Sequence, residues 1–225
     1  MNDLPPLTPR LRLIADMVPF GSRLADVGTD HAYLPAFLVS KGICPSCYAG
    51  DIHRGPLENA EKTLARYRVS DRVTTVLSAG LRQFPPACAD TVVIAGMGGD
   101  QIGEIVAEAS WLRSPSVTLL LQPMTMQERC RRVLYENGFF CEREAYAEEG
   151  KHLYVVMQFR FSEKPLPPPD DVFFYVGTAK EQSDPLASSY LLQRKEKLRR
   201  MIGGMEKTPR CEKEAAKLRA LLDRL

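Results

Sequence analysis

The sequence predicts an α/β domain built on a mostly parallel sheet, followed by a small domain of two helices. Three observations favour this fold class. Short apolar segments rich in β-branched residues alternate with amphipathic helical segments, and helices that connect strands in this way impose parallel pairing. A proline-rich stretch, Lys164–Asp171, cannot form helix or central strand and indicates a spacer. Apolar residues at heptad spacing follow it.

Composition limits the class of protein. The chain has 225 residues, of which 44% are hydrophobic and 26% charged, as in ordinary globular proteins. It contains no apolar run near the roughly 18 residues that a membrane span needs, and its first residues do not resemble a secretory signal. Six irregularly spaced cysteines indicate reduced thiols rather than a disulfide framework. We expect a cytoplasmic protein.

The elements of the first domain follow from this alternation. A short helix at Arg10–Val18 precedes the first strand. The predicted parallel strands are Arg23–Val27, Cys47–Asp51, Val73–Leu77, Thr91–Ala95 and Val117–Gln122. The predicted helices between and after them are Ala32–Lys41, Pro56–Arg68, Asp100–Ala109 and Met126–Asn137. Two further strands, Phe139–Tyr146 and His152–Phe161, flank a turn and predict an antiparallel hairpin at the sheet edge. This pattern is typical of the Rossmann-like class I methyltransferase sheet, which binds S-adenosyl-L-methionine.

The spacer divides the chain into predicted domains at residues 1–163 and 170–225. Two helices are expected in the second domain, forming a helical hairpin of the antiparallel coiled-coil kind. Gly203 and Gly204 are expected to loosen the chain between the helices, and Thr208 and Pro209 to start the second one. The apolar positions that predict the hairpin are Leu191, Leu198, Met201 and Met205, then Cys211, Ala215, Leu218, Leu222 and Leu225.

Charge is distributed unevenly between the two parts. Residues 177–225 hold 12 Lys and Arg against 7 Asp and Glu, a net +5, whereas residues 1–176 hold 18 against 21. A nearly neutral body with a basic tail suits an enzyme that acts on a nucleic acid, and the basic run Arg194–Arg200 could neutralise phosphates. A charged, solvated flank of a coiled coil explains the same run equally well.

The segment Asp26–Pro35 lies where the first strand turns into the next helix, which is where open α/β sheets bind ligands. Gly28 permits the tight turn, and Asp51 ends the second strand at the interval where an acid meets ribose hydroxyls. A dinucleotide fingerprint would need glycine at 30 and 33, where Asp30 and Tyr33 stand. This argues against a nucleotide-dependent oxidoreductase and favours a cationic ligand without phosphate. The alternative reading is that Asp30 only caps the helix.

Two further sites are expected at the same sheet edge. The glycine-rich turn at Gly96, Met97, Gly98 and Gly99 allows close approach of a flat ligand, although a plain strand-to-helix turn is the alternative. Gln122 ends the fifth strand and offers a polar amide. Cys44 and Cys47 have metal-ligand spacing without a second pair, so two free thiols and no metal are expected.

Taken together, these motifs resemble the bacterial TrmK family of tRNA (adenine-22-N1)-methyltransferases. The resemblance runs from about Arg10 to Phe161, and the helical tail resembles the C-terminal coiled-coil domain of the family. It implies S-adenosyl-L-methionine as cofactor and tRNA as partner, with no membrane and no metal. The segments that carry it are Asp26–Pro35, Gly55 and Pro56, Gly80 and Leu81, Ala95–Gly99 and Leu121–Pro123.

The resemblance also implies roles for residues. Asp51 would hold the ribose hydroxyls, where the family usually has glutamate. Ala79 replaces the acid expected beside the adenine, so Ser78 Oγ or a backbone carbonyl would have to accept from the adenine amino group. Asp30, His31 and Tyr33 are the expected catalytic residues. The expected cofactor-binding residues are Asp26, Gly28, Thr29, Asp30, His31, Asp51, Ser78, Ala79, Gly80, Gly96 and Met97.

The expected reaction is methyl transfer to N1 of an adenine, whose in-plane lone pair needs no strong base, so that alignment of the reacting atoms carries catalysis. Asp30 would stabilise the positive charge of the product, with His31 or Tyr33 fixing the base or taking a proton. The sequence leaves two alternatives open. One is a cofactor-binding module without catalysis, which the alanine at position 79 favours, and the other is a methyltransferase of the same fold that acts on a small molecule.

Overall fold

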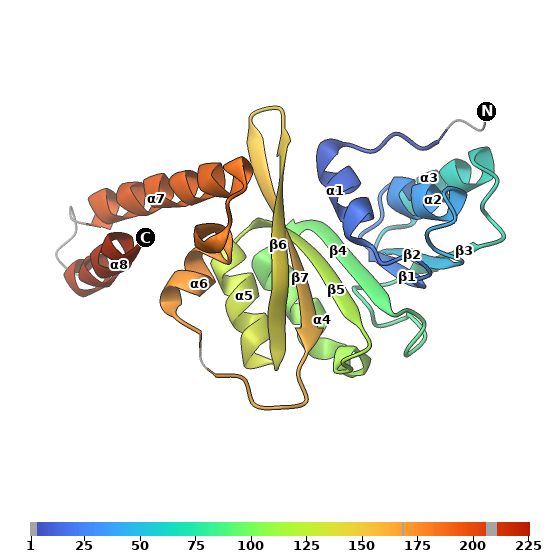
Figure 1. The fold of residues 1–225 in the computed structure, drawn as a ribbon. Helices are drawn as coiled ribbons and strands as arrows, with labels where there is room; N and C mark the ends of the chain where they lie inside the picture. The colour runs from blue at the N-terminus through green and yellow to red at the C-terminus, as the bar shows by residue number, and fades with distance from the viewer. Residues whose placement is uncertain (1–3, 168, 206–210) are drawn as a thin grey trace. The chain divides into compact units, whose positions relative to one another are not determined.

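The structure, a computed structural model, describes residues 4–167, 169–205 and 211–225. It divides into two compact units, Met1–Leu166 and Pro167–Leu225, each described by itself below. Figure 1 shows the first unit as a sheet with helices on both faces and the second unit as a group of helices.

The first unit is organised by one sheet in the order β3-β2-β1-β4-β5-β7-β6. The first five strands along the chain pair in parallel, and β7 pairs antiparallel with both β5 and β6. The predicted fold class, a parallel sheet closed by an antiparallel hairpin, is therefore confirmed. The strands are β1 (Leu24–Val27), β2 (Cys47–Asp51), β3 (Val73–Leu77), β4 (Thr91–Gly98), β5 (Thr118–Thr125), β6 (Phe139–Glu149) and β7 (His152–Phe161).

Helices cover both faces of this sheet (Figure 1). They are α1 (Pro9–Met17), α2 (Tyr33–Ser40), α3 (Arg54–Arg66), α4 (Gly99–Glu108) and α5 (Gln127–Glu136), with a short 3-10 helix at Ser110–Leu112. Helix α1 starts with Thr8 as its N-cap, whose side chain accepts a hydrogen bond from the N–H of Leu11. Helices α4 and α5 pack together and against β4, β5 and β6. The parallel strands thus end at an edge from which the helices of both layers begin.

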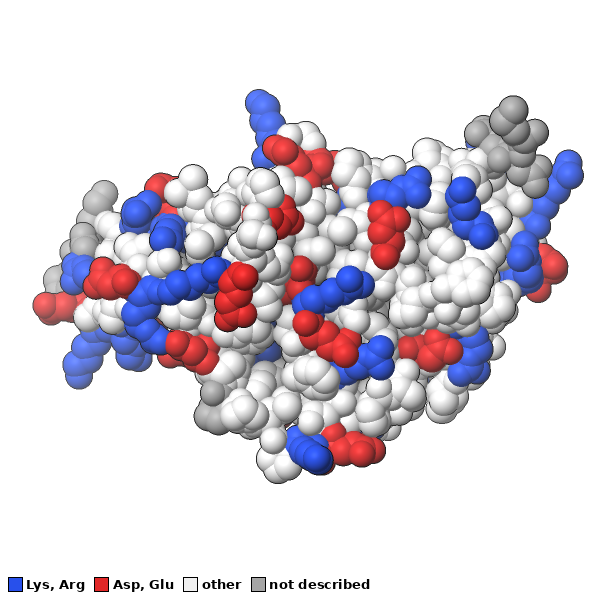
Figure 2. Space-filling view, viewed as in Figure 1, with Lys and Arg blue, Asp and Glu red and all other residues white. Residues whose placement is uncertain are grey.

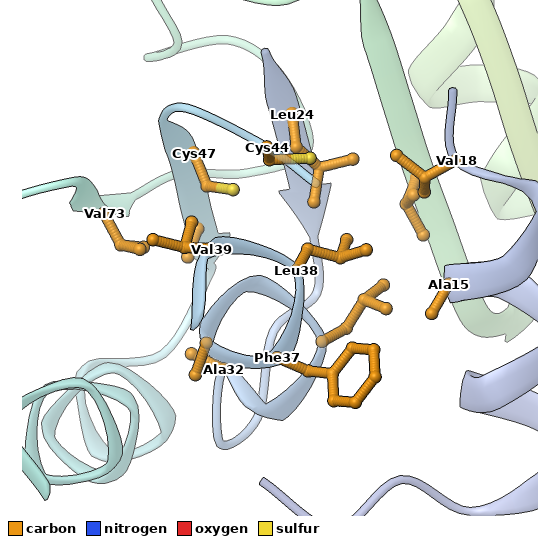
Figure 3. Packing of buried hydrophobic residues seen from close by; sticks show 14 of the residues in the cluster. Ala15, Val18, Leu24, Ala32, Phe37, Leu38, Val39, Cys44, Cys47 and Val73 are labelled. Atoms are coloured by element: carbon orange, nitrogen blue, oxygen red, sulfur yellow. The ribbon is translucent and has the colours of Figure 1, made fainter. Parts of the chain in front are cut away.

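The main core lies between the sheet and helices α1, α2 and α3 (Figure 3). Ile14 of α1, Phe37 and Leu38 of α2 and Leu64 of α3 are all buried there. Complete burial of each such side chain contributes about 1.5 to 3 kcal/mol. The side chains of Cys44 and Cys47 are buried in the same cluster as free thiols (Figure 3). This apolar packing fixes the start of α2, which carries the motif residues.

A buried ion pair joins the opposite face of the sheet to helix α5. Nε of Arg131 donates to Oε1 of Glu144 over 2.7 Å, and both side chains are completely buried. The hydroxyl of Tyr146 donates to the same carboxylate over 3.2 Å. Removal of one partner of such a pair strongly destabilises the folded protein, because the other charge stays buried without its counter-ion. The pair therefore holds α5 in one place on the sheet.

The second unit contains more helix than the sequence indicated. It has α6 (Asp171–Val176), a 3-10 helix at Ala179–Glu181, α7 (Pro185–Met205) and α8 (Glu212–Arg224). Figure 1 shows α8 returning beside α7. Buried Leu198 and Ile202 of α7 pack with Tyr175 of α6 and with the leucines of α8. The two-helix prediction missed α6 because six residues are too short a segment to show a helical period.

Of three expectations for the tail, two are corrected by the structure and the third concerns residues outside the described ranges. Gly203 and Gly204 do not break the helix, because α7 continues through both to Met205. Ile202, four residues after Leu198, is buried, whereas Met201 is exposed, so the buried face is one residue away from the predicted heptad position. Thr208 and Pro209, the expected start of the second helix, lie outside the described residues.

Arg194 also differs from its expected role as a surface residue. Its side chain is 3% exposed, its Nε donates to the carbonyl of Tyr175 over 3.2 Å, and its guanidinium lies 4.2 Å from the centre of that tyrosine ring. The cation is therefore part of the core between α6 and α7. The exposed part of the basic run starts after it.

Candidate functional site

The carboxyl ends of β1, β2, β3 and β4 meet at one edge of the sheet. The strand register places Val27 beside Gly50 and Ile94, and Asp51 beside Leu77. A cleft of about 210 Å³ opens at this edge. Its lining consists of Val27, Gly28, Asp51, Ile52, Ser78, Ala79, Gly80, Arg82, Met97, Gln101, Glu104, Ile105 and Glu108. The structure thus brings together six of the predicted cofactor-binding residues: Gly28, Asp51, Ser78, Ala79, Gly80 and Met97.

Gly28 forms the floor of the cleft. It has φ +81°, in the left-handed region that side chains rarely adopt, and a Cβ atom there would lie 2.3 Å from Cε of Met97. The N–H groups of Gly28 and Thr29 both donate to the carbonyl of Gly50, at 2.8 and 2.9 Å. The turn after β1 is therefore tied to β2, and the missing side chain leaves room for the Met97 methyl group, which also lines the cleft.

Asp26 lies beneath this turn as a buried carboxyl group. Burial raises its pKa to about 6, although a hydrogen bond with the side chain of Thr29 lowers the pKa and the charge of Asp51 raises it further. A nearby cation would stabilise the ionised form of such a carboxylate. Asp26 and Thr29 are both buried and are absent from the lining of the cleft.

The three predicted catalytic residues form a separate cluster at the start of α2. Nε2 of His31 lies 3.4 Å from Oδ2 of Asp30, and the rings of His31 and Tyr33 stack with centroids 5.4 Å apart. All three are at least partly exposed, and none lines the cleft. The N-cap of α2 is Ala32, with φ 51°, so the alternative that Asp30 caps this helix is wrong.

The loop after β3 uses most of its own polar groups. Ser78 Oγ donates to the carbonyl of Gly80 over 2.8 Å and accepts from the N–H of Gln83 over 3.2 Å. The N–H of Ala79 donates to Oε1 of Gln83, also over 3.2 Å. Ser78 is therefore engaged in holding the loop, which weighs against the expectation that its hydroxyl replaces the missing acid at 79.

Gln122 and Gly96 meet on the other side of the strand ends. Oε1 of Gln122 accepts from Nη1 of Arg10 over 2.7 Å and from the N–H of Gly96 over 3.2 Å. Gln122 is completely buried, so its amide holds the irregular end of β4, to which Gly96 belongs, rather than standing open to a ligand. Gly96 itself does not line the cleft. The role of Arg10 was not predicted, since a lone arginine on a terminal helix carries no sequence signal.

The wall contributed by α4 was also missed. Four residues of this helix line the cleft: Gln101, Glu104, Ile105 and Glu108. The guanidinium of Arg82 donates one hydrogen bond to each carboxylate oxygen of Glu108, at 2.8 and 3.0 Å. The three-, four- and seven-residue spacing of the four helix residues is that of one helix face. This spacing could have identified them, had the helix been treated as part of the site.

The described ranges contain neither a metal site nor a membrane-spanning helix. Among residues 4–167, 169–205 and 211–225, no group of three or more His, Cys, Asp or Glu residues could hold a metal ion. In the same ranges, no helix combines the length and apolar character needed to cross a membrane.

Comparisons with known proteins point in one direction. Residues 7–157 match the model of a family described as "Methyltransferase domain". A tRNA (adenine(22)-N(1))-methyltransferase of Bacillus subtilis (strain 168) is 31% identical over 157 residues, which are 70% of this chain and 66% of that protein. The match thus spans just under two thirds of the length of that relative.

Solved structures resemble more of the chain. The crystal structure of the Bacillus subtilis tRNA methyltransferase TrmK has a TM-score of 0.83 at 26% identity, over 98% of this chain and 96% of that one. A Streptococcus pneumoniae protein described as a candidate tRNA (m1A22) methyltransferase was solved in complex with S-adenosyl-L-methionine. It has a TM-score of 0.80 at 28% identity, over 96% of this chain and all of the other.

Proposed function

Because the chain belongs to the methyltransferase-domain family, we propose that it transfers a methyl group from S-adenosyl-L-methionine to N1 of adenine 22 in tRNA. The sequence resemblance to the TrmK family is confirmed, since the relatives named above carry this activity in their names or titles. The observation that carries the proposal is the cleft at the ends of β1 to β4, which is lined by Gly28 of the turn after β1 and by Asp51 at the end of β2.

The residues of the cleft fit the cofactor. Gly28, which has no side chain, and Met97 packed against it line the cleft, and the lining holds the carboxylates of Asp51, Glu104 and Glu108 against one guanidinium, that of Arg82. An acidic cleft suits a ligand that carries an ammonium and a sulfonium and has no phosphate. Asp51 would hold the ribose hydroxyls. Gly28, Asp26, Thr29 and Asp30 would serve the methionine end.

S-adenosyl-L-methionine supplies an electrophilic methyl group on a cationic sulfur. The chain's own residues have to position the target base and exclude water, because N1 of neutral adenine is already nucleophilic. The exposed cluster of Asp30, His31 and Tyr33 stands next to the glycine turn and is suited to this task. Asp30 would stabilise the cationic methylated base, and the stacked His31 and Tyr33 rings would hold the base or take the proton from N6.

The target adenine has to leave its helix to reach the cleft, and the rest of the tRNA needs a second contact surface. The net charge of +5 on residues 177–225 supports a role for the second unit in binding phosphates. On the face drawn in Figure 2, basic side chains are interspersed with acidic ones, on the helical unit as well as elsewhere. A tRNA substrate also supports the expectation of a cytoplasmic protein.

The proposal is tested by incubating the protein with labelled S-adenosyl-L-methionine and unmodified tRNA, then identifying the methylated nucleoside by mass spectrometry. 1-Methyladenosine is the expected product. Asp51→Ala should lower the affinity for S-adenosylhomocysteine by about ten- to a hundredfold, as expected for a lost charge-assisted contact. Transfer to a small molecule but not to tRNA would overturn the substrate assignment.

A further inference from the structure

We propose that Glu104 of α4 recognises the amino group of the adenine ring in S-adenosyl-L-methionine. This inference rests on the proposed function and adds to it a residue that determines the choice of base. It starts from a chemical requirement: the adenine ring presents an exocyclic amine, a donor of two hydrogen bonds. Selection of adenine over a 6-oxo purine needs an acceptor at that place, and a carboxylate is the strongest one available.

The loop after β3 does not supply a side chain for this purpose. Position 79 is alanine, and Ser78 Oγ already donates to the carbonyl of Gly80 and accepts from the N–H of Gln83. The carbonyl of Ala79 accepts from the N–H of Arg82 over 3.4 Å. Ser78 Oγ and the carbonyls of Ala79 and Gly80 are thus used to hold the loop itself.

Two of the other carboxylates in the cleft are engaged as well. Oδ1 of Asp51 accepts from the N–H of His53 over 2.8 Å, and Asp51 lies at the end of β2, where the ribose is expected. Both carboxylate oxygens of Glu108 accept from Arg82, and this pair lowers the pKa of Glu108. In contrast, Glu104 lines the cleft with no hydrogen bond or ion pair to any part of the chain that the structure describes.

The packing of the loop on α4 sets the position of Glu104. A Cβ atom on Gly80, which has φ +61°, would lie 2.9 Å from Cγ1 of Ile105, so loop and helix touch at this point. Two residues further along the loop, Arg82 pairs with Glu108, one turn further along the helix. Glu104, the residue before Ile105, lines the same cleft as Ala79. We therefore infer that the Glu104 carboxylate takes the part of the acceptor that alanine at position 79 lacks.

The inference is tested by calorimetry with two ligands, S-adenosylhomocysteine and S-inosylhomocysteine, which differ in carrying an amino group or an oxo group at C6. The parent protein is expected to prefer the adenosyl compound by about ten- to a hundredfold. Glu104→Ala should abolish most of this preference. Glu104→Gln should narrow it, because an amide can accept from an amino group or donate to an oxo group.

Two further variants sharpen the experiment. Glu136→Gln removes an exposed glutamate on α5 outside the cleft and should leave the preference unchanged. Ala79→Asp should restore the preference in the Glu104→Ala background, and in the parent it should give no gain, because two carboxylates that share one site repel each other. If Glu104→Ala keeps the parent's preference, the inference is wrong. If the parent protein binds neither compound, the proposed function itself fails.

Discussion

The guanidinium of Arg10 donates a hydrogen bond to Oε1 of Gln122 over 2.7 Å, across 112 positions of the chain. It joins helix α1 to strand β5, directly beside Gly96 of β4, whose N–H donates to the same oxygen. The arginine side chain also lies 5.5 Å from the centre of the Tyr154 ring. The edge of the site is thus held by three elements that are distant in sequence.

This relationship gives a prediction for Gln122→Leu. The substitution removes the acceptor of both bonds, and Arg10 Nε is already buried without a hydrogen-bond partner within the described residues. The guanidinium would lose its acceptor, and the free energy of unfolding should fall by about 1.5 to 3 kcal/mol. Urea denaturation measures this change. Gln122→Glu, which keeps the acceptor, is the matched control, and equal stability of parent and leucine variant would contradict the account.

The buried carboxyl group of Asp26 predicts a dependence on pH. Its pKa is raised to about 6 from 3.8, so the stability it contributes is fully present below pH 3.8 and is lost as the pH rises through 6. At pH 8 the ionised group costs about 3 kcal/mol in the protein without cofactor. Asp26→Asn should therefore raise the free energy of unfolding at pH 8 and have little effect near pH 4.

The same substitution should weaken the binding of S-adenosylhomocysteine, because a buried negative charge near the methionine end is lost. Stability and binding are thus expected to change in opposite directions. If Asp26→Asn is less stable than the parent at pH 8, the conclusion that the ionised Asp26 carboxylate destabilises the protein is wrong.

The basic run on α7 predicts an effect of salt. Lys195, Lys197, Arg199 and Arg200 are the candidates for phosphate contacts, since Arg194 is buried. Reversal of these four charges to glutamate should weaken tRNA binding, and each lost contact should reduce the slope of log affinity against log salt by about 0.7 to 0.9. Binding of S-adenosylhomocysteine should not change. Undiminished binding and methylation of tRNA would identify the run as solvated surface.

The ion pair of Arg131 and Glu144 predicts a large loss of stability on removing one partner. Arg131→Met leaves a completely buried carboxylate without its cation and should lower the free energy of unfolding by about 3 to 5 kcal/mol. The double variant with Glu144→Leu should recover much of that loss. Thermal and urea unfolding of the variants measure these changes in the free energy of unfolding. If the loss in the double variant equals the sum of the losses in the two single variants, the two side chains are not directly coupled.

Much of the first unit could be predicted because its signals are local. Strands β2, β3 and β7 have the predicted bounds, since apolar runs and turn residues mark both ends. Strands β4 and β5 extend to Gly98 and Thr125, beyond the prediction, because they continue to pair past the apolar segment through an irregular register. Gly28 and Asp51, which line the cleft, were singled out from the ends of predicted strands, whereas Gly80 came from the resemblance to the TrmK family.

The remainder of the site depends on contacts between distant segments. Nothing local distinguishes Glu104 from other glutamates on exposed helices, and only the packing of Gly80 against Ile105 places it in the cleft. In the same way, heptad spacing predicted Met201 at the buried face of α7, whereas packing against α6 and α8 selects Ile202. Burial of Arg194 follows from Tyr175 of α6, an element without a sequence signal of its own.

The central claim is methyl transfer to one adenine of tRNA, and a paired transcript experiment tests it most directly. Labelled S-adenosyl-L-methionine is incubated with the protein and an unmodified tRNA transcript, and in parallel with a transcript in which adenine 22 is replaced by guanine. The account predicts that the first transcript gains 1-methyladenosine at position 22 and that the second gains no label. Equal labelling of both transcripts, or the absence of 1-methyladenosine from the first, would contradict it.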